Sequence, residues 1–465
     1  MTDPRAAAEA VLAHVDANLE QSLSRLEALL RIPSISTEPA FAAQCRAAAE
    51  WLRADLQGEG FEASLRDTEG HPMVVAHDKA AEGPHVLFYG HYDVQPVDPL
   101  DLWHTDPFEP VRLVQPDGET HISARGASDD KGQLMTFVEA CRAWRAVTGS
   151  LPVKVTMLFE GEEEAGSPSL LPFLERTGPE LTADIALVSD TDMWDKQTPS
   201  IVTMLRGLVG EEIEITCADK DLHSGMFGGA ARNPLQLLSE IIASMRNPDG
   251  SVALEGFYDD VAELPPEVAE QWKRLPFSDT DFLAGVGLSV PAGETGRTVL
   301  EQITSRPTFE VNGMIGGYTG DGFKTVIASK ARAKISFRLV SGQDPDKIRE
   351  AFRAHVRARL PADASVTFHA HGGSPAIAVP ADGPFLNKAL GALGAEWGRE
   401  AAIAGSGGSI PIVGAFKRQL GMDTLLIGFA QIDDRIHSPN EKYNLTSFRK
   451  GIRSWVRVLA AFAQR

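Results

Sequence analysis

The sequence predicts an α/β protein with a parallel sheet at its centre and a smaller α+β domain inserted into it. Three observations lead to this prediction. Short buried strands alternate with helical segments from about residue 86 to 189, a strand of different character lies at 326–340, and the α/β pattern returns after about residue 384. The chain of 465 residues is also longer than one ordinary core supports, so two domains are expected.

Three apolar runs predict the strands of the parallel sheet: HVLFYG (85–90), VKVTMLFE (153–160) and DIALVS (184–189). They are rich in β-branched and aromatic residues, which is typical of strands buried on both faces. A segment with helical periodicity, 131–147, separates the first two runs. Because strands that alternate with helices form βαβ units, the sheet is expected to be parallel.

The inserted domain is expected at residues 207–383, and the larger domain at 1–206 and 384–465. The segment 326–340 alternates strictly, with apolar side chains on one face and basic ones, including Arg338, on the other. This pattern predicts an antiparallel strand that is buried on one side only. Between 248 and 320 the chain is rich in Pro and Gly and has no strong periodicity. The other elements of this domain are expected at 210–218, 231–247, 344–360 and 364–372.

Composition and charge exclude several classes of function. The net charge of −20 argues against a nucleic-acid-binding protein, which needs a basic face to neutralise phosphates. No apolar run approaches the roughly 18–20 residues of a membrane helix, and the N-terminus resembles an amphipathic helix rather than a signal peptide. The three cysteines are sparse and have no metal-like spacing, which fits a reducing compartment. We therefore expect a cytoplasmic protein.

Polar residues that packing does not explain follow the predicted strands, where open α/β sheets bind ligands. His91 and Asp93 end the first strand, at positions whose side chains point the same way in an extended chain. Asp93 could therefore accept the second ring N–H of a metal-bound His91. The other candidates follow later in the chain. They are Asp129 and Asp130, Glu160, Glu162, Glu163 and Glu164, Asp190 and Asp192, and His437.

Each of these residues also has an ordinary interpretation. An aspartate in a Gly-rich loop is usually a turn or cap residue, and a run of glutamates is usually solvated surface. For Glu160 and Glu162 these two interpretations stay open. The argument for a site is the co-location of five acidic or histidine positions after strands of one sheet. Two histidines with several carboxylates suit a dinuclear Zn²⁺ or Mn²⁺ site with one bridging carboxylate.

Eight motifs occur in an order that resembles one known family. They are GHYDVQP, RGASDDKG, EGEEEAGS, SDTDMW, DKDLHSGMFGG, SFRLV, GSGGSIP and IHSPNEKY. Together they resemble the carnosinase/aminoacylase/carboxypeptidase G family of co-catalytic di-zinc metallopeptidases over nearly the whole chain. The form of DLHSGMFGG and the 248–320 insertion resemble the branch that contains carnosinase and the cytosolic non-specific dipeptidase. The resemblance implies an α/β/α catalytic domain and an inserted, ferredoxin-like lid and dimerisation domain.

The resemblance also implies roles in a two-metal site. Asp129, rather than Asp130, would bridge the two ions. His91 and Asp190 would complete the protein ligands of one ion, with Asp190 preferred to Asp192 because it directly follows its strand. Glu164 and His437 would complete those of the other ion. Asp93 would orient His91, and Glu163 would be the general base that deprotonates the water bridging the metals and later protonates the leaving amine.

Further roles implied by the resemblance fall on the inserted domain. His223 would reach the active site of the neighbouring subunit and stabilise the oxyanion. Arg338 would hold the C-terminal carboxylate of the substrate, for which a guanidinium is well suited. Thr325 and His371 would contact substrate from the lid, and Ser409 from the catalytic side. One departure from the family is Ser406, where carnosinase-type dipeptidases often have a glutamate that helps hold the free amino group of the substrate.

We therefore expect a homodimeric dipeptidase that binds two divalent metal ions, Zn²⁺ or Mn²⁺, and hydrolyses the amide bond of dipeptides or short peptides. An N-acyl- or N-carbamoyl-amino-acid amidohydrolase is the alternative, because Ser406 leaves the amine side of the pocket ambiguous. A third interpretation is a non-catalytic protein that kept the fold. The presence of all five ligand positions and of Glu163 argues against it, because such proteins usually lose a ligand or the base.

Overall fold

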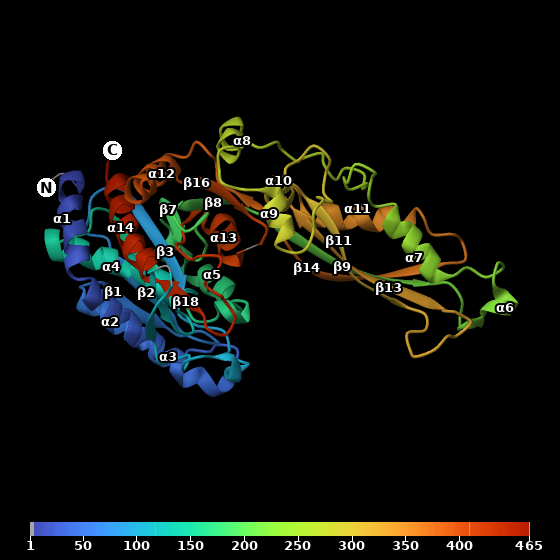
Figure 1. Cartoon of the computed structure of the whole chain (residues 1–465), viewed down its shortest axis with the longest axis horizontal. Coiled ribbons are helices and arrows are strands. Elements are labelled where there is room, and N and C mark those ends of the chain that lie inside the picture. Colours follow the sequence, from blue (N-terminus) through green and yellow to red (C-terminus); the bar gives the residue numbers. More distant parts are fainter. Residues whose placement is uncertain (1–3, 117, 409, 465) are drawn as a thin grey trace. The chain divides into compact units, whose positions relative to one another are not determined.

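A computed structural model describes residues 4–116, 118–408 and 410–464 (Figure 1). The chain forms two compact units, each described here by itself. Unit 1 comprises residues 1–203, 379–404 and 415–465, and unit 2 comprises 204–378 and 405–414.

Unit 1 contains a large sheet and several helices. Its helices are α1 (Pro4–Ala17), α2 (Leu19–Leu30), α3 (Ala42–Gly58), α4 (Lys131–Thr148), α5 (Leu170–Leu181), α12 (Pro384–Trp397) and α14 (Leu445–Phe462). Its strands are β1 (Glu62–Arg66), β2 (Met73–Asp78), β3 (His85–His91), β4 (Val111–Val114), β5 (Thr120–Ser123), β6 (Lys154–Glu160), β7 (Ile185–Val188), β17 (Thr424–Leu426) and β18 (Lys442–Asn444). Two strands, β8 (Ser200–Leu205) and β16 (Ala402–Ser406), and the short helix α13 (Pro411–Ala415) cross the boundary between the units.

The large sheet has the strand order β1-β2-β6-β3-β7-β17-β8, with β16 beside β8. Its centre is parallel, because β3 pairs in parallel with both β6 and β7, and β7 pairs in parallel with β17. The flanking pairs β1–β2, β2–β6 and β17–β8 are antiparallel. The predicted parallel strands are confirmed, and the sheet as a whole is mixed.

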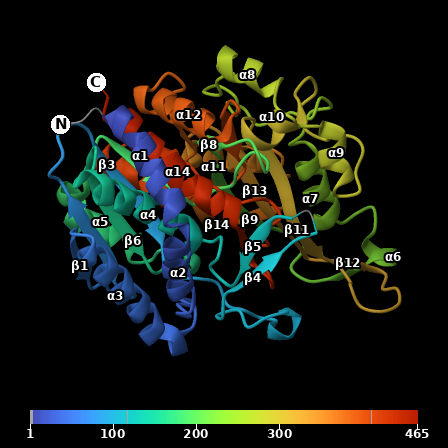
Figure 2. The same ribbon diagram turned by 60° about the vertical axis from the view of Figure 1, so that its left-hand side comes forward.

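Helices and turns cover both faces of this sheet. Successive residues of a strand point to opposite faces, so the side chains of Phe88 and Tyr89 lie on opposite faces of the sheet. The ring of Phe88 stacks on Phe137 of α4 and meets Trp455 of α14 edge-on. The ring of Tyr89 instead meets Phe416, in the turn Phe416–Leu420. In both views α1, α4 and α14 lie side by side, as their packing requires (Figures 1 and 2).

Unit 2 is built on a four-stranded antiparallel sheet of order β11-β13-β9-β14. Helices α7 and α11 pack against it. Its strands are β9 (Gly207–Thr216), β10 (Leu222–His223), β11 (Thr308–Gly316), β12 (Val326–Ile327), β13 (Lys330–Leu339), β14 (Ser365–Ser374) and β15 (Ile377–Ala378). Its helices are α6 (Ser224–Phe227), α7 (Pro234–Ala243), α8 (Pro266–Trp272), α9 (Asp279–Ala284), α10 (Val299–Thr304) and α11 (Pro345–Arg357).

The one-sided strand predicted at 326–340 divides into β12 and β13, which belong to different sheets. Within β13 buried and accessible residues alternate as expected, and Arg338 lies on the accessible face. The edge strand β11 falls inside the 248–320 segment, where no strand was predicted. Most of its residues are accessible on both faces, so it lacks the apolar alternation that identifies a strand from sequence.

Candidate metal centre

The candidate metal-ligating residues of unit 1 gather at one edge of its sheet. His91 is the last residue of β3, Asp190 lies two residues beyond β7, and Glu164 lies in a short 3₁₀ turn, Glu163–Ala165, after β6. Because these three strands are parallel, their carboxyl ends meet at the same edge. Asp129 reaches this edge from the loop before α4, and His437 from the loop between β17 and β18.

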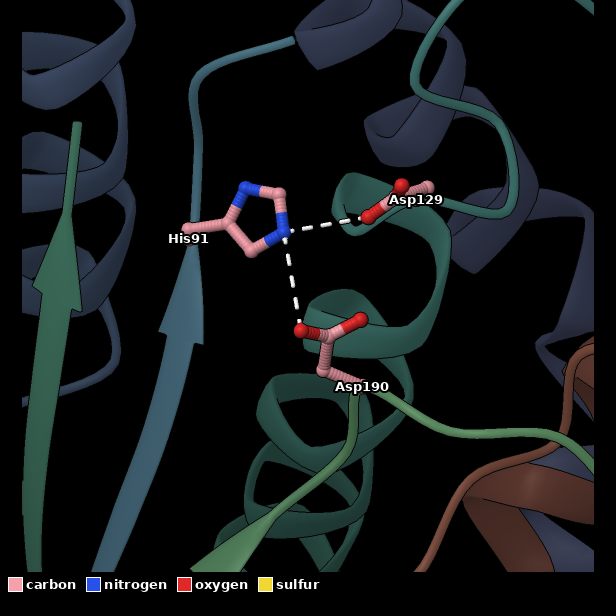
Figure 3. Close-up of side chains that lie close together, drawn as sticks. All are labelled: His91, Asp129 and Asp190. Atoms are coloured by element: carbon pink, nitrogen blue, oxygen red, sulfur yellow. Dashed lines mark hydrogen bonds and ion pairs between the residues drawn. The ribbon is translucent and has the colours of Figure 1, made fainter. Parts of the chain in front are cut away.

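One group consists of His91, Asp129 and Asp190. The His91 Nε2 atom lies 3.1 Å from Asp129 Oδ1 and 4.0 Å from Asp190 Oδ2. Figure 3 shows the imidazole at the end of its strand with both carboxylates facing the same ring nitrogen. One nitrogen and two oxygens that converge in this way could hold a metal ion.

A second group consists of Asp129, Glu164 and His437. The His437 Nε2 atom lies 2.9 Å from Asp129 Oδ2 and 3.2 Å from Glu164 Oε2. In each group the ligand atoms all lie within 4.8 Å of one another. Asp129 belongs to both groups and turns one oxygen to each histidine, so its carboxylate is placed to bridge two ions.

The histidines respond electrostatically to this crowding of carboxylates. Burial would lower the pKa of His91, but the hydrogen bonds to Asp129 and Asp93 outweigh it and raise that pKa well above the usual value. Hydrogen bonds to Asp129 and Glu164 raise the pKa of His437 to about 10. In the metal-free protein the two imidazoliums therefore carry the positive charge that the carboxylates attract.

The carboxylates show that this edge is short of positive charge. Burial and the negative charge of Asp129 raise the pKa of Asp190, and Oε1 of Glu164 is buried without a hydrogen-bond partner among the described residues. A divalent ion at each group would supply charge and a ligand position to these atoms. The donor set of imidazole nitrogens and carboxylate oxygens fits Zn²⁺ and Mn²⁺.

Asp93 connects the His91 strand to the glutamate turn. Its Oδ1 atom lies 3.3 Å from His91 Nδ1, so it faces the ring nitrogen opposite the proposed metal position. The same carboxylate accepts hydrogen bonds from the backbone N–H groups of Glu163 and Glu164 and from the Ser36 hydroxyl. Asp93 therefore orients an imidazole and a turn together.

Glu160, which ends β6, and the three glutamates that follow it have different surroundings. Glu160 is buried and accepts hydrogen bonds from the hydroxyls of Tyr89 and Ser167. Glu162 is also buried, and its carboxylate accepts from the backbone N–H groups of His71 and Ser169. Neither is solvated surface, so both are structural residues of this edge.

Glu163 lies beside the ligands without belonging to either group of potential ligands. Burial raises the pKa of its carboxyl; His91 opposes that rise, and the carboxylates of Glu164 and Asp93 add to it. A partly buried carboxylate of this kind is suited to accept and return a proton. Bound dications would act in the opposite direction on its pKa.

Asp130 and Asp192, the alternatives to Asp129 and Asp190, lie outside the two groups of candidate ligands. Asp130 is fully buried, and its Oδ2 atom accepts a hydrogen bond from the backbone N–H of His91 at 3.1 Å. Asp192 is exposed and its backbone forms an isolated bridge with Ala430. Neither belongs to the two groups, whereas Asp129 and Asp190 do.

In unit 2 the structure brings His223 and Thr325 together. His223 pairs with Val326 across β10 and β12, and the Ser224 N–H donates to the carbonyl of Thr325. Both His223 and Thr325 are exposed. The Nδ1 atom of His223 accepts a hydrogen bond from the Gly225 N–H at 3.0 Å, so its ring proton resides on Nε2.

Arg338 and His371 lie on the four-stranded sheet, not on the two-stranded sheet of β10 and β12. Arg338 pairs with Leu208, near the start of β9, and His371 lies in a bulge of β14 with Nε2 at 3.5 Å from Glu212. The stretch of β9 from Leu208 to Thr216 spans roughly 26 Å at the usual rise of a strand. Unit 2 therefore does not bring Arg338 near His223. Ser409 lies outside the described residues.

Sequence reasoning missed two residues of interest. Glu441 is fully buried and accepts a hydrogen bond from the backbone N–H of Asp129 at 3.0 Å. Burial and the positive charge of Arg338 lower the pKa of Arg206 to about 10, and the negative charge of Glu310 opposes that shift. The sequence spacing could have identified Arg206. It precedes Leu208, the partner of Arg338, by two residues, so in an extended chain its side chain points to the same face as Arg338.

The sequence and the fold resemble those of known proteins. The sequence model of peptidase family M20/M25/M40 matches residues 87–461. The chain is 29% identical to the Cys-Gly metallodipeptidase of Schizosaccharomyces pombe, over 94% of this chain and 95% of that protein. It is 30% identical to the Beta-Ala-His dipeptidase of Homo sapiens, over 82% of this chain and 75% of that protein.

A solved structure extends the agreement to three dimensions. An M20 family metallo-carboxypeptidase from Sulfolobus solfataricus is 32% identical and matches with a TM-score of 0.78, over 95% of this chain and 99% of that one. Among the described residues, no helix combines the length and apolar character needed to cross a bilayer. With the family model covering most of its length, the chain belongs to peptidase family M20/M25/M40.

Proposed function

We propose that the protein is a metal-dependent dipeptidase whose two metal ions share Asp129 and whose general base is Glu163. The observation that carries the proposal is the pair of three-residue groups with Asp129 in common, His91–Asp129–Asp190 and Asp129–Glu164–His437. Glu163 adjoins one ligand in the chain and is itself in neither group. A metal-dependent hydrolase needs metal ligands and a general base, and the residues proposed for these two roles lie at the same edge of one sheet.

The metal ions, Glu163 and Asp93 have separate roles in the proposed hydrolysis of the amide bond. Bound divalent ions supply Lewis acidity, which lowers the pKa of a coordinated water and polarises the scissile carbonyl. Glu163 accepts the proton from the attacking water and delivers it to the nitrogen of the departing amine. Asp93 holds the His91 ring and, through two backbone N–H groups, the turn that carries Glu163. Zn²⁺ is the metal we expect, with Mn²⁺ as the alternative.

We assign the C-terminal carboxylate of the substrate to Arg338, with Arg206 beside it. The side chain of Arg338 forms no hydrogen bond or ion pair with a described residue, and the Nε atom of Arg206 is buried without a partner among them. Two guanidiniums close together repel each other unless an anion lies between them. A peptide carboxylate meets this need and matches the planar donors of arginine.

The site is completed, in this proposal, by a second copy of the chain. Along β13, Arg338 lies roughly 26 Å from Lys330, and His223 lies beyond that end of the strand, paired with Val326, so the two residues are too far apart for both to contact one dipeptide. His223 is exposed, and with Nδ1 accepting from Gly225 it offers the Nε2 proton as a donor. In a homodimer His223 and Thr325 would serve the partner's site and stabilise the oxyanion there. His371 and Ser409 are proposed as further substrate contacts, and the compartment as the cytoplasm.

Dipeptides are favoured over N-acyl amino acids as substrates. The relatives that match over most of this chain are a Cys-Gly metallodipeptidase and a Beta-Ala-His dipeptidase. The observation that keeps the deacylase as second candidate is Ser406. Its hydroxyl accepts a hydrogen bond from the Gly408 N–H and provides no negative charge for a substrate ammonium group.

A substrate panel tests the proposal. Metal-free protein is loaded with Zn²⁺ or Mn²⁺, and kcat/KM is measured for free dipeptides, dipeptide amides, N-acetyl amino acids and longer peptides. We expect the highest values for free dipeptides, a large loss for the amides because the carboxylate is masked, and no turnover after chelation. Faster cleavage of N-acetyl amino acids would make the protein a deacylase, and turnover that survives chelation would contradict a metal-dependent mechanism.

A further inference from the structure

The loop between β17 and β18, which carries His437, has a strained backbone. Arg435, His437 and Asn440 have φ angles of 58°, 59° and 64°. These values lie in the left-handed region that residues other than glycine rarely occupy. Of the four such non-glycine residues among those described, three lie here. Since a strained conformation persists only where its surroundings hold it, the direction of the His437 side chain depends on the anchors of this loop.

The strongest anchor is Glu441, at the end of the loop. One of its carboxylate oxygens accepts hydrogen bonds from the backbone N–H groups of Ser128 and Asp129, at 2.9 and 3.0 Å. The other accepts from the Gly126 N–H at 3.0 Å and from the guanidinium of Arg125 at 2.7 Å. Both Glu441 and Arg125 are buried. A single carboxylate thus takes four donors from the segment that ends in the shared ligand Asp129.

Asp434 provides a second tie between the same two segments. Its Oδ2 atom accepts hydrogen bonds from the hydroxyl of Ser128 at 2.9 Å and from the backbone N–H of Gln431 at 2.8 Å. Asp434 is fully buried, and Lys442 donates to its other oxygen. The loop of His437 and the loop of Asp129 are therefore joined on both sides of His437.

We propose that Glu441 is a positioning residue that fixes His437 relative to Asp129, and so sets the affinity of the site for the metal ion that these two residues share with Glu164. Glu441 touches none of the ligand atoms, because its four donors are three backbone N–H groups and one guanidinium. It acts through the backbone that carries Asp129. The inference rests on the metal centre proposed above, and it adds a determinant of metal affinity outside the ligand set.

The test is calorimetric titration of Zn²⁺, and separately of Mn²⁺, into the metal-free full chain with Glu441→Gln. The amide has nearly the same shape but offers an NH₂ group where one oxygen stood, so two of the four donors lose their acceptor. We expect one of the two metals to bind about 10- to 100-fold more weakly, the range seen when residues that orient ligands are changed. Turnover should return at high metal concentration with KM unchanged.

Glu396→Gln is the matched control. Glu396 is another buried carboxylate of unit 1, paired with Arg453 and Arg457, and its loss should lower stability without changing metal affinity. Wild-type affinity for both metals in Glu441→Gln would overturn the proposal. Equal losses of affinity in the two variants, in proportion to their losses of stability, would also overturn it. Because metal binding is read without substrate, a failure of the dipeptidase proposal gives a different result, namely intact metal binding without peptide turnover.

Ser128→Ala keeps the inference testable if Glu441→Gln does not fold. This change removes the hydroxyl that donates to Asp434 while leaving all four donors to Glu441 and every charge in place. We expect a smaller loss of affinity for the same metal. An unchanged affinity in Ser128→Ala, combined with an unfolded Glu441→Gln, would show that these ties serve stability alone and would overturn the proposal.

Discussion

The two units differ in how completely each assembles its functional residues. In unit 1, His91, Asp129 and His437 are linked through side chains only 2.9–3.1 Å apart, and buried carboxylates hold the loops that carry them. In unit 2, His223, Thr325 and His371 are exposed, and Arg338 lies far from His223. The candidate metal centre is thus assembled within unit 1 alone, whereas the proposed substrate-binding residues of unit 2 are spread over a surface.

The difference extends to charge. The edge of the sheet in unit 1 concentrates carboxylates that could hold cations, whereas in unit 2 the positive charge of Arg338 lowers the pKa of Arg206, so an anion at this pair would be stabilised. Mutations should therefore separate into two kinds. Those in unit 1 should alter metal binding or the chemical step, and those in unit 2 should alter how the substrate is held.

The largest effect is expected at Glu163. Glu163→Gln removes the proposed base, so kcat should fall by about 10²–10⁴-fold while both metals stay bound. Glu164→Ala, one residue away, should instead lose the metal shared with His437. Metal content by elemental analysis, measured beside kcat, distinguishes the two variants. Near-normal turnover in metal-loaded Glu163→Gln would remove Glu163 from the mechanism.

His223 provides the next largest effect and tests whether unit 2 takes part in chemistry at all. His223→Ala should lower kcat by on the order of 10²–10³-fold, as the loss of an oxyanion donor does, without changing metal content. His223→Asn is the control, because asparagine can still accept from the Gly225 N–H and preserve the turn. It should be as inactive as the alanine variant. A normal kcat in both variants would leave His223 with a structural role only.

Arg338 should affect substrate binding more than chemistry. Arg338→Met removes charge-assisted hydrogen bonds to the substrate carboxylate, which are worth about 1.5–3 kcal/mol, or roughly 10- to 150-fold in kcat/KM. The loss should be seen with free dipeptides and not with dipeptide amides. Arg332→Met is the matched control on the same face of β13, because Arg332 pairs with Glu214. An equal loss of kcat/KM for free dipeptides and for dipeptide amides would show that Arg338 does not bind the substrate carboxylate.

The smallest expected effect concerns stability and pH. Burial lowers the pKa of His355 in unit 2 from 6.5 to about 4. Between these values the unfolded chain binds a proton that the folded chain does not, so stability is lost as the pH falls from about 6.5 to about 4.

His355→Gln removes this titration and keeps a partner for Ser244, which bonds His355 at 2.8 Å. Urea unfolding at several pH values should show a shallower loss of stability for the variant over this range. His85→Gln is the companion in unit 1, because burial lowers the pKa of His85 to about 4 as well. An unchanged slope in His355→Gln would mean that this histidine is protonated in the folded protein.

The sequence predicted the centre of unit 1 well because its strands have unambiguous patterns. The runs that became β3, β6 and β7 are apolar throughout, and residues that directly follow parallel strands must meet at one edge. The strand pattern alone therefore groups His91, Glu164 and Asp190. Asp129 and His437 were also candidates from their positions along the chain, but the family resemblance was needed to prefer Asp129 to Asp130 and to assign both residues to metal ions.

What could not be predicted depends on contacts between distant segments. Glu441 binds residues more than 300 positions away, and no local pattern reports such a contact. The edge strand β11 was missed because it is accessible on both faces, and the break between β12 and β13 because Ile327 and Ala331, on either side of it, both fit the apolar face of one strand. The antiparallel flanks of the large sheet were missed for a related reason, since pairing direction is set by the connections and not by the strands.

The shared carboxylate of Asp93 has a consequence for how this site tolerates mutation over evolutionary time. Glu163 and Glu164 are neighbours in the chain, and their N–H groups bond the same acceptor. The Cα atoms of the proposed base and the proposed ligand are therefore one peptide unit apart, about 3.8 Å. Substitutions elsewhere that move this turn carry both residues together, so the core of unit 1 can change in sequence while the separation of these two residues stays nearly constant.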